Sequence, residues 1–228
     1  MAADYSNTTI IIPTLNESEN ITKLLSNLVE LYPKINVIVA DDGSKDGTQE
    51  QVNEFENLYS NIILLDRCNE KTKGLCSSVI DAVKIVTTTN IIVMDGDLQH
   101  PPEKVRELIE NLSSCSLVIG TRNKIKEPWS LHRKSLSVIS TKLAKLRVDY
   151  NDPMSGFFAV KTDLIQSILN NHEPKFEKTG YKVLFDILKY LPNETKVAEV
   201  NYDFLLREHG KTKIGIRQIF AFLRALVK

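Results

Sequence analysis

Short apolar runs alternate with segments of helical periodicity over the first 120 residues, and this alternation limits the possible folds more than any other feature of the sequence. The apolar runs predict strands at residues 10–12, 37–40, 62–65, 91–94 and 116–119. Between them, apolar residues recur at the three- and four-residue spacing of a helix, as in Ile21, Leu24, Leu25 and Leu28. This order is typical of an α/β domain, in which helices cover both faces of a mostly parallel sheet.

Polar clusters follow three of the predicted strands. P-T-L-N-E comes after the first strand, D-D-G-S after the second and D-G-D after the fourth. Within the first cluster, Asn16 and Glu17 are candidate caps for the next helix. Because ligands of parallel sheets bind beyond the carboxyl ends of the strands, we expect the three clusters to meet at one edge of the sheet.

The alternation weakens after residue 120. We predict a helix over residues 129–146, a strand over 157–160, a helix over 181–191 and an extended segment over 197–206. No linker rich in Pro, Gly or Ser separates this part from the first, so we interpret residues 1–228 as a single domain.

The composition excludes several classes of protein. Lys and Arg together number 29, as do Asp and Glu, so no net charge draws the chain to nucleic acid. The three cysteines form no C-x-x-C pair, which argues against a disulfide scaffold or a zinc site and fits a reducing compartment. No apolar run reaches the roughly 20 residues of a membrane-spanning helix, and the N-terminus lacks a signal-peptide pattern. We therefore expect a cytoplasmic protein that is soluble or peripheral on a membrane.

Asp95 and Asp97 stand directly after the predicted strand at 91–94. A strand that is ending can direct both carboxylates at one cation. Proteins typically hold Mg²⁺ with one or two carboxylates plus substrate phosphates, so this pair suffices if a diphosphate supplies the other oxygens. A solvated loop with two acids is the plain alternative. A D-x-D phosphatase is another, but such enzymes usually have Thr or Val where this chain has Gln99.

Asp41 and Asp42 follow the second predicted strand in the same way. Gly43 and Gly47 let the turn adopt backbone angles that other residues avoid. The two acids can simply cap the turn and the next helix, or they can accept hydrogen bonds from a base and a ribose.

Six motifs occur along the chain: P-T-L-N-E (13–17), V-A-D-D-G-S-K-D-G-T (39–48), M-D-G-D-L-Q-H-P-P-E (94–103), G-T-R (120–122), D-P-M-S-G-F-F (152–158) and R-E-H-G-K-T-K (207–213). Together they resemble the family-two inverting glycosyltransferases of the α/β GT-A fold, which is Rossmann-like. Within that family, D-L-Q-H-P-P, D-P-M-S-G-F and the final R-x-x-G-x-x-K resemble the branch that mannosylates dolichyl or polyprenyl phosphate. The resemblance covers residues 9 to about 215.

The resemblance implies a role for the residue at each matching position. The residues that would bind the nucleotide sugar are Pro13, Leu15, Glu17, Ala40, Asp42, Gly96, Arg207 and Lys213. Those that would hold Mg²⁺ or Mn²⁺ on the donor diphosphate are Asp95, Asp97 and Gln99. Those that would bind the acceptor's phosphate are Arg122, Arg133 and Ser137, and the implied catalytic residues are Asp95, Asp97 and Arg122. The chain departs from the family pattern at Leu15, where Tyr is usual, at Cys76, where Gly is usual, and at Thr212, where Ser is usual.

The implied reaction transfers mannose from GDP-mannose to dolichyl or polyprenyl phosphate with inversion at the anomeric carbon. A lipid phosphate is an anionic nucleophile near neutral pH, so the reaction needs no general base. It does need a divalent ion and basic side chains to stabilise the departing diphosphate. His100 is therefore expected in a supporting or surface position. By the same resemblance, residues 1–120 would form the nucleotide-sugar and metal half and residues 121–212 the acceptor half.

Other functions stay open at this point. A UDP-sugar donor, carrying glucose or an N-acetylhexosamine, would use the same metal site. A D-x-D phosphatase would hydrolyse phosphomonoesters without a nucleotide sugar. A non-catalytic subunit that binds a nucleotide sugar would have lost ligands that this chain keeps. A sugar nucleotidyltransferase should have a Gly-rich loop with an Arg after the first strand, and P-T-L-N-E is not such a loop.

Residues 213–228 form an amphipathic helix on a helical wheel. One arc holds the basic residues Lys213, Arg217, Arg224 and Lys228. The adjoining side is apolar and holds Ile216, Ile219, Phe220, Leu223, Leu226 and Val227. Such a helix can lie in the headgroup region of the cytoplasmic face of a membrane, with Trp129 as a second interfacial anchor. Alternatively it can pack on the domain core, or dock on a small membrane-embedded partner subunit.

Overall fold

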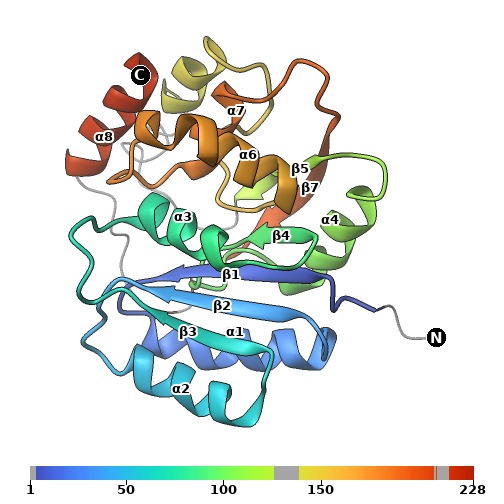
Figure 1. Cartoon of the computed structure of the whole chain (residues 1–228), viewed down its shortest axis with the longest axis vertical. Coiled ribbons are helices and arrows are strands. Elements are labelled where there is room, and N and C mark those ends of the chain that lie inside the picture. The colour runs from blue at the N-terminus through green and yellow to red at the C-terminus, as the bar shows by residue number, and fades with distance from the viewer. Residues whose placement is uncertain (1–3, 126–138, 208, 210–215) are drawn as a thin grey trace.

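A sheet of seven strands, in the order β3-β2-β1-β4-β6-β5-β7, forms the centre of the molecule (Figure 1). The structure is a computed structural model that describes residues 4–125, 139–207, 209 and 216–228. The strands are β1 (Thr8–Thr14), β2 (Asn36–Asp41), β3 (Ile62–Asp66), β4 (Asn90–Val93), β5 (Leu117–Ile125), β6 (Phe158–Lys161) and β7 (Val197–Phe204). Every strand predicted from an apolar run is present, within a few residues of its predicted bounds.

The sheet is mostly parallel, as predicted. β1 pairs in parallel with β2 and β4, β2 with β3, and β5 with β7. The exception is β6, which lies antiparallel between β4 and β5. An apolar run reports that a strand is buried on both faces but not its direction, so the sequence pattern could not reveal this reversal.

Helices cover both faces of the sheet (Figure 1). One layer contains α1 (Ser18–Leu31), α2 (Thr48–Leu58) and α4 (Val105–Asn111), which begins after the short helix η1 (Pro102–Lys104). The other layer contains α3 (Leu75–Ile85), α6 (Thr162–His172), α7 (Val183–Lys189) and α8 (Ile216–Val227), with the short helix η2 (Glu173–Lys175) after α6.

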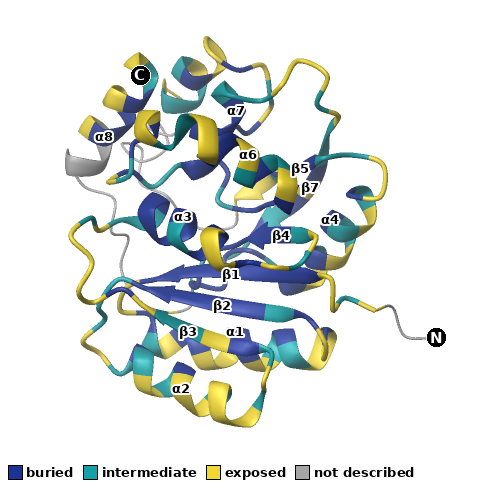
Figure 2. Cartoon of the chain, in the orientation of Figure 1, coloured by how far each residue is buried: buried dark blue, intermediate teal, exposed yellow. Residues whose placement is uncertain are grey.

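Two hydrophobic clusters fill the spaces between the sheet and these layers. Alternate residues of β1 contribute to the two clusters. Ile10 and Ile12 pack with α1 and α2, while Ile11 packs with α3. All of β1 is buried, and the outward faces of the helices are exposed (Figure 2). The central strands are therefore fixed from both sides, which makes their ends a rigid support for a site.

Two details differ from the sequence-based predictions. Helix α6 was not predicted, although Ile165, Ile168 and Leu169 are buried at helical spacing. Asn16 does not cap α1, because its φ is 53° and its Oδ1 accepts a hydrogen bond from the Lys45 N–H at 2.9 Å. The predicted capping residue instead ties the loop after β1 to the loop after β2.

Helix α8 confirms that the C-terminal residues are helical, and one of its faces packs on the core. Ala221, Phe222 and Ala225 are buried there, while Phe220 and Leu223 are exposed. Of the helix predicted over 129–146, residues 139–145 are helical; Trp129 lies outside the described residues. Among the residues with a described position, no helix is both long and apolar enough to cross a bilayer.

Candidate active site

The carboxyl ends of β1, β2 and β4 lie at one edge of the sheet and bring the three predicted polar clusters together. Pro13 is in register with Ala40, and Thr14 with Asp41. Thr14 Oγ1 donates a hydrogen bond to Asp41 Oδ2 at 2.9 Å, which joins the first two clusters directly. The sequence-based expectation of one shared edge is confirmed.

Asp41 shapes the turn after β2. The residue is fully buried, and its Oδ1 accepts hydrogen bonds from the N–H groups of Gly43 (3.0 Å) and Ser44 (2.8 Å). Gly43 has a φ of 89°, in the region that favours glycine. Asp41 therefore caps the turn, which is the first of the two alternatives considered for this pair of acids.

Asp42 instead belongs to a buried polar network. Its carboxylate pairs with the buried guanidinium of Arg67 and accepts a hydrogen bond from the Gly74 N–H at 2.6 Å. Arg67 also donates to Asp81 at 2.9 Å and to Ser78 Oγ at 2.8 Å. Burial raises the pKa of Asp42, against the lowering effect of Gly74 and Arg67. The carboxylate of Asp42 is thus held in a fixed orientation by Arg67 and Gly74.

Asp95 lies at the end of β4 and is only partly solvated. Its backbone N–H donates to His100 Nδ1 at 3.0 Å, and its Oδ1 is buried with no hydrogen-bond partner among the described residues. Burial raises the pKa of Asp95, and the charges of Lys182 and Arg207 offset part of that rise. The segment from 152 to 158 lies close to this carboxylate. A Cβ added at Gly156 would be only 2.9 Å from Asp95 Oδ2.

Asp97 faces a cation from a distant part of the chain. Its Oδ2 pairs with the guanidinium of Arg207, just past β7, and its Oδ1 accepts the Gln99 N–H at 3.1 Å. Burial and the charge of Asp95 raise the pKa of Asp97 to about 6, although Arg207 opposes the rise. Between these residues Leu98 has a φ of 62°, a strained conformation for a leucine. The turn is therefore held in place by its surroundings.

Gln99 and Glu17 connect this turn to Arg207. Gln99 Nε2 donates to the Leu205 carbonyl at 3.1 Å, and the Leu205 N–H donates to the Gln99 carbonyl at 3.0 Å. Glu17 Oε1 lies 3.9 Å from Arg207 Nη1. These contacts draw Arg207 to the edge where β1 and β4 end.

His100 is a buried supporting residue, as expected. Its ring stacks on Phe157 with centroids 5.1 Å apart and meets Tyr202 and Phe204 edge-on. Burial lowers the pKa of His100 to about 4. The neutral ring can therefore accept the Asp95 N–H and support the turn without carrying charge.

Arg122, at the far side of Asp95, makes a forked contact. Its Nε and Nη2 donate to the two carboxylate oxygens of Asp152 at 2.7 and 2.8 Å. Burial would raise the pKa of Asp152, but the hydrogen bonds and charge of Arg122 outweigh it and the pKa is lowered. Lys182 approaches the same segment, and its Nζ donates to the Met154 carbonyl at 2.5 Å.

The donor set fits a divalent cation that a substrate helps to hold. The buried Asp95 Oδ1 has no partner among the described residues. Burial raises the pKa of both carboxyls, and the charge of Asp95 adds to the rise at Asp97. Within the described ranges, no group of three or more His, Cys, Asp or Glu side chains is placed to hold a metal. A carboxylate pair of this kind suits an ion whose remaining ligands are phosphate oxygens and water.

The remaining predicted residues are placed as follows. Leu15 is exposed at the edge, Pro13 and Ala40 are buried in their strands, and Gly96 packs against Thr14. Arg133, Ser137 and Lys213 lie outside the described residues.

Sequence reasoning gave no role to Arg67, Asp152, Gly156 or Lys182. Asp152 and Gly156 lie inside a motif that the sequence pointed out, but what they contact is only visible in three dimensions. A signal for Lys182 was present in the sequence, since it is a lysine directly before a helix whose residues 183–188 are all buried.

Known proteins resemble this chain in sequence and in structure. The sequence profile described as glycosyl transferase family 2 matches residues 9–169. A dolichol-phosphate mannosyltransferase of Pyrococcus furiosus is 36% identical, over 96% of this chain and 62% of its own length. The protein of the same name from Saccharomyces cerevisiae is 31% identical, over 99% of this chain and 86% of its own length. The chain thus spans less than two thirds of the archaeal relative.

Solved structures confirm the fold. Mannosyl-3-phosphoglycerate synthase of Rubrobacter xylanophilus matches with a TM-score of 0.65 at 15% identity, over 96% of this chain and 72% of that one. Glucosyl-3-phosphoglycerate synthase of Mycobacterium tuberculosis, in complex with Mn²⁺, UDP and glucosyl-3-phosphoglycerate, matches with a TM-score of 0.63 at 21% identity, over 96% and 77%. At these identities the likeness concerns the fold alone.

The resemblance inferred from the six motifs is confirmed by the profile and by the named relatives. The chain belongs to glycosyl transferase family 2.

Proposed function

We propose that this protein transfers mannose from GDP-mannose to dolichyl or another polyprenyl phosphate, with inversion at the anomeric carbon. The observation that carries the proposal is the carboxylate pair of Asp95 and Asp97 with a guanidinium on either side, Arg207 at Asp97 and Arg122 beside the segment that contacts Asp95. Such a site suits two anionic substrates that meet at one point. Relatives that carry the name of this activity cover nearly the whole chain.

In this proposal the two halves of the sheet edge bind different substrates. Residues 1–120 hold the donor through Pro13, Leu15, Glu17, Ala40, Asp42 and Gly96, with Arg207 and Lys213 on the diphosphate. Residues 121–212 hold the acceptor, with Arg122, Arg133 and Ser137 on its phosphate. Asp95, Asp97 and Gln99 would hold Mg²⁺ or Mn²⁺.

The reaction is a single displacement. An oxygen of the lipid phosphate forms a bond to the anomeric carbon of mannose, while the bond from that carbon to the donor's diphosphate breaks and GDP leaves with the electron pair. The bound divalent ion supplies positive charge for the developing diphosphate. Arg207 lies at the donor side of Asp97 and can stabilise the same leaving group. Because the acceptor is already ionised, no residue has to remove a proton.

A lipid acceptor requires contact with a membrane, and we propose that α8 contributes to it at the cytoplasmic face, directly or through a small membrane-embedded subunit. Phe220, Leu223 and Val227 are exposed on this helix, by 58%, 44% and 85%. Arg224 and Lys228 each pair with Glu177, at 3.2 and 3.1 Å, although both side chains remain exposed. The apolar residues, more than these two basic ones, support the contact.

The test is transfer of a labelled sugar into lipid. The protein is incubated with Mn²⁺ or Mg²⁺, a short polyprenyl phosphate in detergent, and radiolabelled GDP-mannose, UDP-glucose or UDP-N-acetylglucosamine in separate reactions. We expect label in the organic phase from GDP-mannose only. Label from a UDP sugar would replace the donor, and no label from any donor in the presence of membranes would overturn the proposal.

Two variants and a chelator show whether the site is responsible. Asp97→Asn should lower transfer by about 100-fold or more, the order of magnitude lost when an electrostatic stabiliser is removed, and EDTA should abolish it. Asp149→Asn makes the same chemical change at an exposed position and should leave transfer unchanged. Full activity of Asp97→Asn, or of the wild type in EDTA, would rule out the metal assignment.

A further inference from the structure

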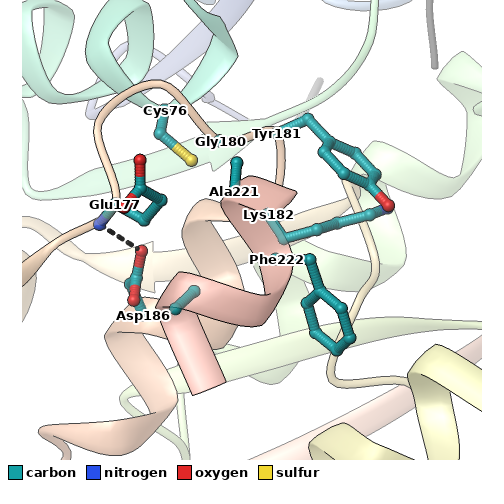
Figure 3. A pocket seen from close by; sticks show the side chains of 9 residues that line it. Cys76, Glu177, Gly180, Tyr181, Lys182, Asp186, Ala221 and Phe222 are labelled. Atoms are coloured by element: carbon teal, nitrogen blue, oxygen red, sulfur yellow. Dashed lines mark hydrogen bonds between the residues drawn. The ribbon is translucent and has the colours of Figure 1, made fainter. Parts of the chain in front are cut away.

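Lys182 is a cation at the candidate site to which the proposed mechanism gives no task. It immediately precedes α7, and its side chain runs beside the ring of Tyr181, with Nζ 4.8 Å from the ring centroid (Figure 3). Among the described residues, the Met154 carbonyl at 2.5 Å is its hydrogen-bond partner, and no carboxylate forms a salt bridge with it. A lysine ammonium has three donors, so two remain for a ligand.

The other two cations of the site are already matched by carboxylates. Arg122 is held by both oxygens of Asp152, and Arg207 pairs with Asp97. Lys182 feels the charges of Asp95 and Asp152 at longer range only. A partly buried ammonium without a carboxylate partner is costly in an unliganded protein, and an anionic ligand would lower that cost.

Lys182 and Arg122 converge on one short segment from different elements. Arg122 comes from β5 and binds Asp152, whereas Lys182 comes from the start of α7 and binds the Met154 carbonyl, two residues further on. Gly156 of the same segment lies close to the Asp95 carboxylate, because a Cβ added there would be 2.9 Å from Oδ2. A phosphate lying along residues 152–156 would therefore meet both cations and would be next to the donor's metal ligands.

The loop that carries Lys182 is anchored on the donor half. The Gly180 carbonyl accepts the Cys76 N–H at 3.1 Å, and the Gly180 N–H donates to the Glu177 carbonyl at 2.8 Å. A small pocket bounded by Cys76, Lys182 and Phe222 separates this loop from α8 (Figure 3). The backbone of this loop is thus held in place before any ligand arrives, which lowers the entropic cost of binding.

We propose that Lys182 binds the phosphate of the acceptor together with Arg122 and holds its attacking oxygen beside Asp95. This inference rests on the proposed function for the identity of the acceptor. It concerns a phosphate monoester, so it can also be tested by binding alone.

The experiment compares Lys182→Met, Lys182→Arg and wild type for binding of farnesyl phosphate and of GDP with Mn²⁺. In Lys182→Met the dissociation constant for farnesyl phosphate should rise roughly ten-fold or more, as expected for the loss of a hydrogen bond between charged groups. The dissociation constant for GDP should change less than about two-fold in the same variant. Lys182→Arg keeps the charge and should restore most of the affinity, whereas farnesol should not distinguish the three proteins. If inorganic phosphate shows the same loss, the headgroup alone is recognised.

Lys189→Met is the matched control. Lys189 is a lysine of α7 that is partly buried, as Lys182 is, but it pairs with Asp186 at 2.7 Å and donates to the Ala225 carbonyl. Its replacement should lower the thermal stability and leave the ratio of the two dissociation constants unchanged. Equal losses for farnesyl phosphate and GDP in Lys182→Met would mean a purely structural lysine and would overturn the inference.

The two proposals fail in different ways. If the wild type transfers mannose and Lys182→Met keeps wild-type affinity for farnesyl phosphate, only the role of Lys182 is wrong. If no sugar is transferred but farnesyl phosphate binds in a manner that depends on Lys182, the inference stands and the reaction is wrong. Should Lys182→Met not fold, Lys182→Arg still decides, because its displaced charge should weaken farnesyl phosphate binding a few-fold and leave GDP binding alone.

Discussion

Asp41 and Asp42 show how two identical neighbours can serve different purposes. Asp41 is fully buried and satisfies the backbone of its own turn, whereas Asp42 reaches across to Arg67 and to the N-terminus of α3. The sequence motif predicts that acids are needed here. It left open whether they cap the turn or bind a base and a ribose, because the two roles differ only in what lies opposite each side chain. For single residues, the motif gives the location and the fold gives the partner.

Gly156 lies close to Asp95, one of the proposed metal ligands. In Gly156→Ala the new Cβ would lie 2.9 and 3.1 Å from the oxygens of Asp95 and 3.2 Å from His100 Cε1, so the carboxylate has to move. We expect Mn²⁺ affinity in the presence of GDP, measured by titration, to fall about 10- to 100-fold, as is typical when a supporting residue of a metal site changes. Sugar transfer should fall with it.

The fold itself should survive this change, because Gly156 does not have a positive φ and the shortest approaches are to a partly solvated carboxylate, with the His100 ring next at 3.2 Å. A melting temperature within a few degrees of wild type would show this. Unchanged Mn²⁺ affinity in a folded Gly156→Ala would contradict the placement of this segment against Asp95.

Among the secondary-structure elements, α8 is attached by one buried face and one ionic cluster. Phe222 packs near Phe185 with ring centroids 5.9 Å apart, and Arg224 and Lys228 both reach Glu177. Burial would raise the pKa of Glu177, but hydrogen bonds from Arg224, Thr179 and Lys228 outweigh it and lower the pKa to about 2. The ionised carboxylate therefore holds the helix onto the loop that leads to Lys182.

The stability of this attachment should depend on pH in a defined direction. A carboxyl with a pKa of about 2 when folded and 4.5 when unfolded contributes stability above pH 4.5, and this contribution is lost as the pH falls towards 2. We expect Glu177→Gln to remove it, with amide exchange of residues 220–228 roughly ten-fold faster at pH 7. Glu173→Gln removes a carboxyl that binds Lys84 and Lys178 but not α8, and should leave that exchange unchanged. Equal exchange in both variants would show that the apolar face alone holds α8.

Most elements could be predicted from the sequence because their apolar patterns record burial. The strands of the first 120 residues and the helices between them followed from those patterns. The direction of β6 and the existence of α6 did not, since a run such as 157–160 is equally apolar in either direction and α6 was outside the strongly periodic part. The cap expected at Asn16 failed because tertiary contact with Lys45 replaced a local one.

For the molecule as a whole, the structure brings together residues from motifs that are far apart in the sequence. Asp95, Asp97, Glu17 and Arg207 meet in space although Arg207 is 110 residues from Asp97. Lys182 could not be assigned, because its role depends on which segment lies opposite it, and Arg67 could not be assigned for the same reason. The motifs singled out Asp95, Asp97 and Arg207, whereas Asp152 and Gly156 lie in a motif but received no role, because their contacts depend on packing.

The exposed apolar residues of α8 make the binding of the whole molecule to membranes testable. Phe220→Ser combined with Leu223→Ser removes two large side chains that are 58% and 44% exposed. We expect partitioning onto phosphatidylcholine vesicles with about 20% phosphatidylserine to fall roughly ten-fold or more, given the transfer free energy of such groups. Because Arg224 and Lys228 are paired with Glu177, the dependence on salt should be weak. Cosedimentation measures both.

Leu58→Ser provides the comparison for this experiment. Leu58 ends α2 in the opposite layer and is 75% exposed, so its loss changes the surface hydrophobicity to a similar extent. It should not change vesicle binding. Equal effects of Leu58→Ser and the α8 variant would show that the contact is non-specific.

The reversed strand β6 has a consequence for how such an enzyme can diversify. Strands that run parallel deliver only the loops that leave them to the ligand-binding edge, and these loops carry most of the residues proposed to bind the donor. The segment 152–157 reaches the same edge from the other direction, because it enters an antiparallel strand. The loops that leave the parallel strands and the segment that enters β6 share no hairpin or helix. Either can therefore change in length or be exchanged without shifting the strand register of the other. A new acceptor could therefore be accommodated by replacing one incoming loop while the nucleotide-sugar scaffold stays as it is.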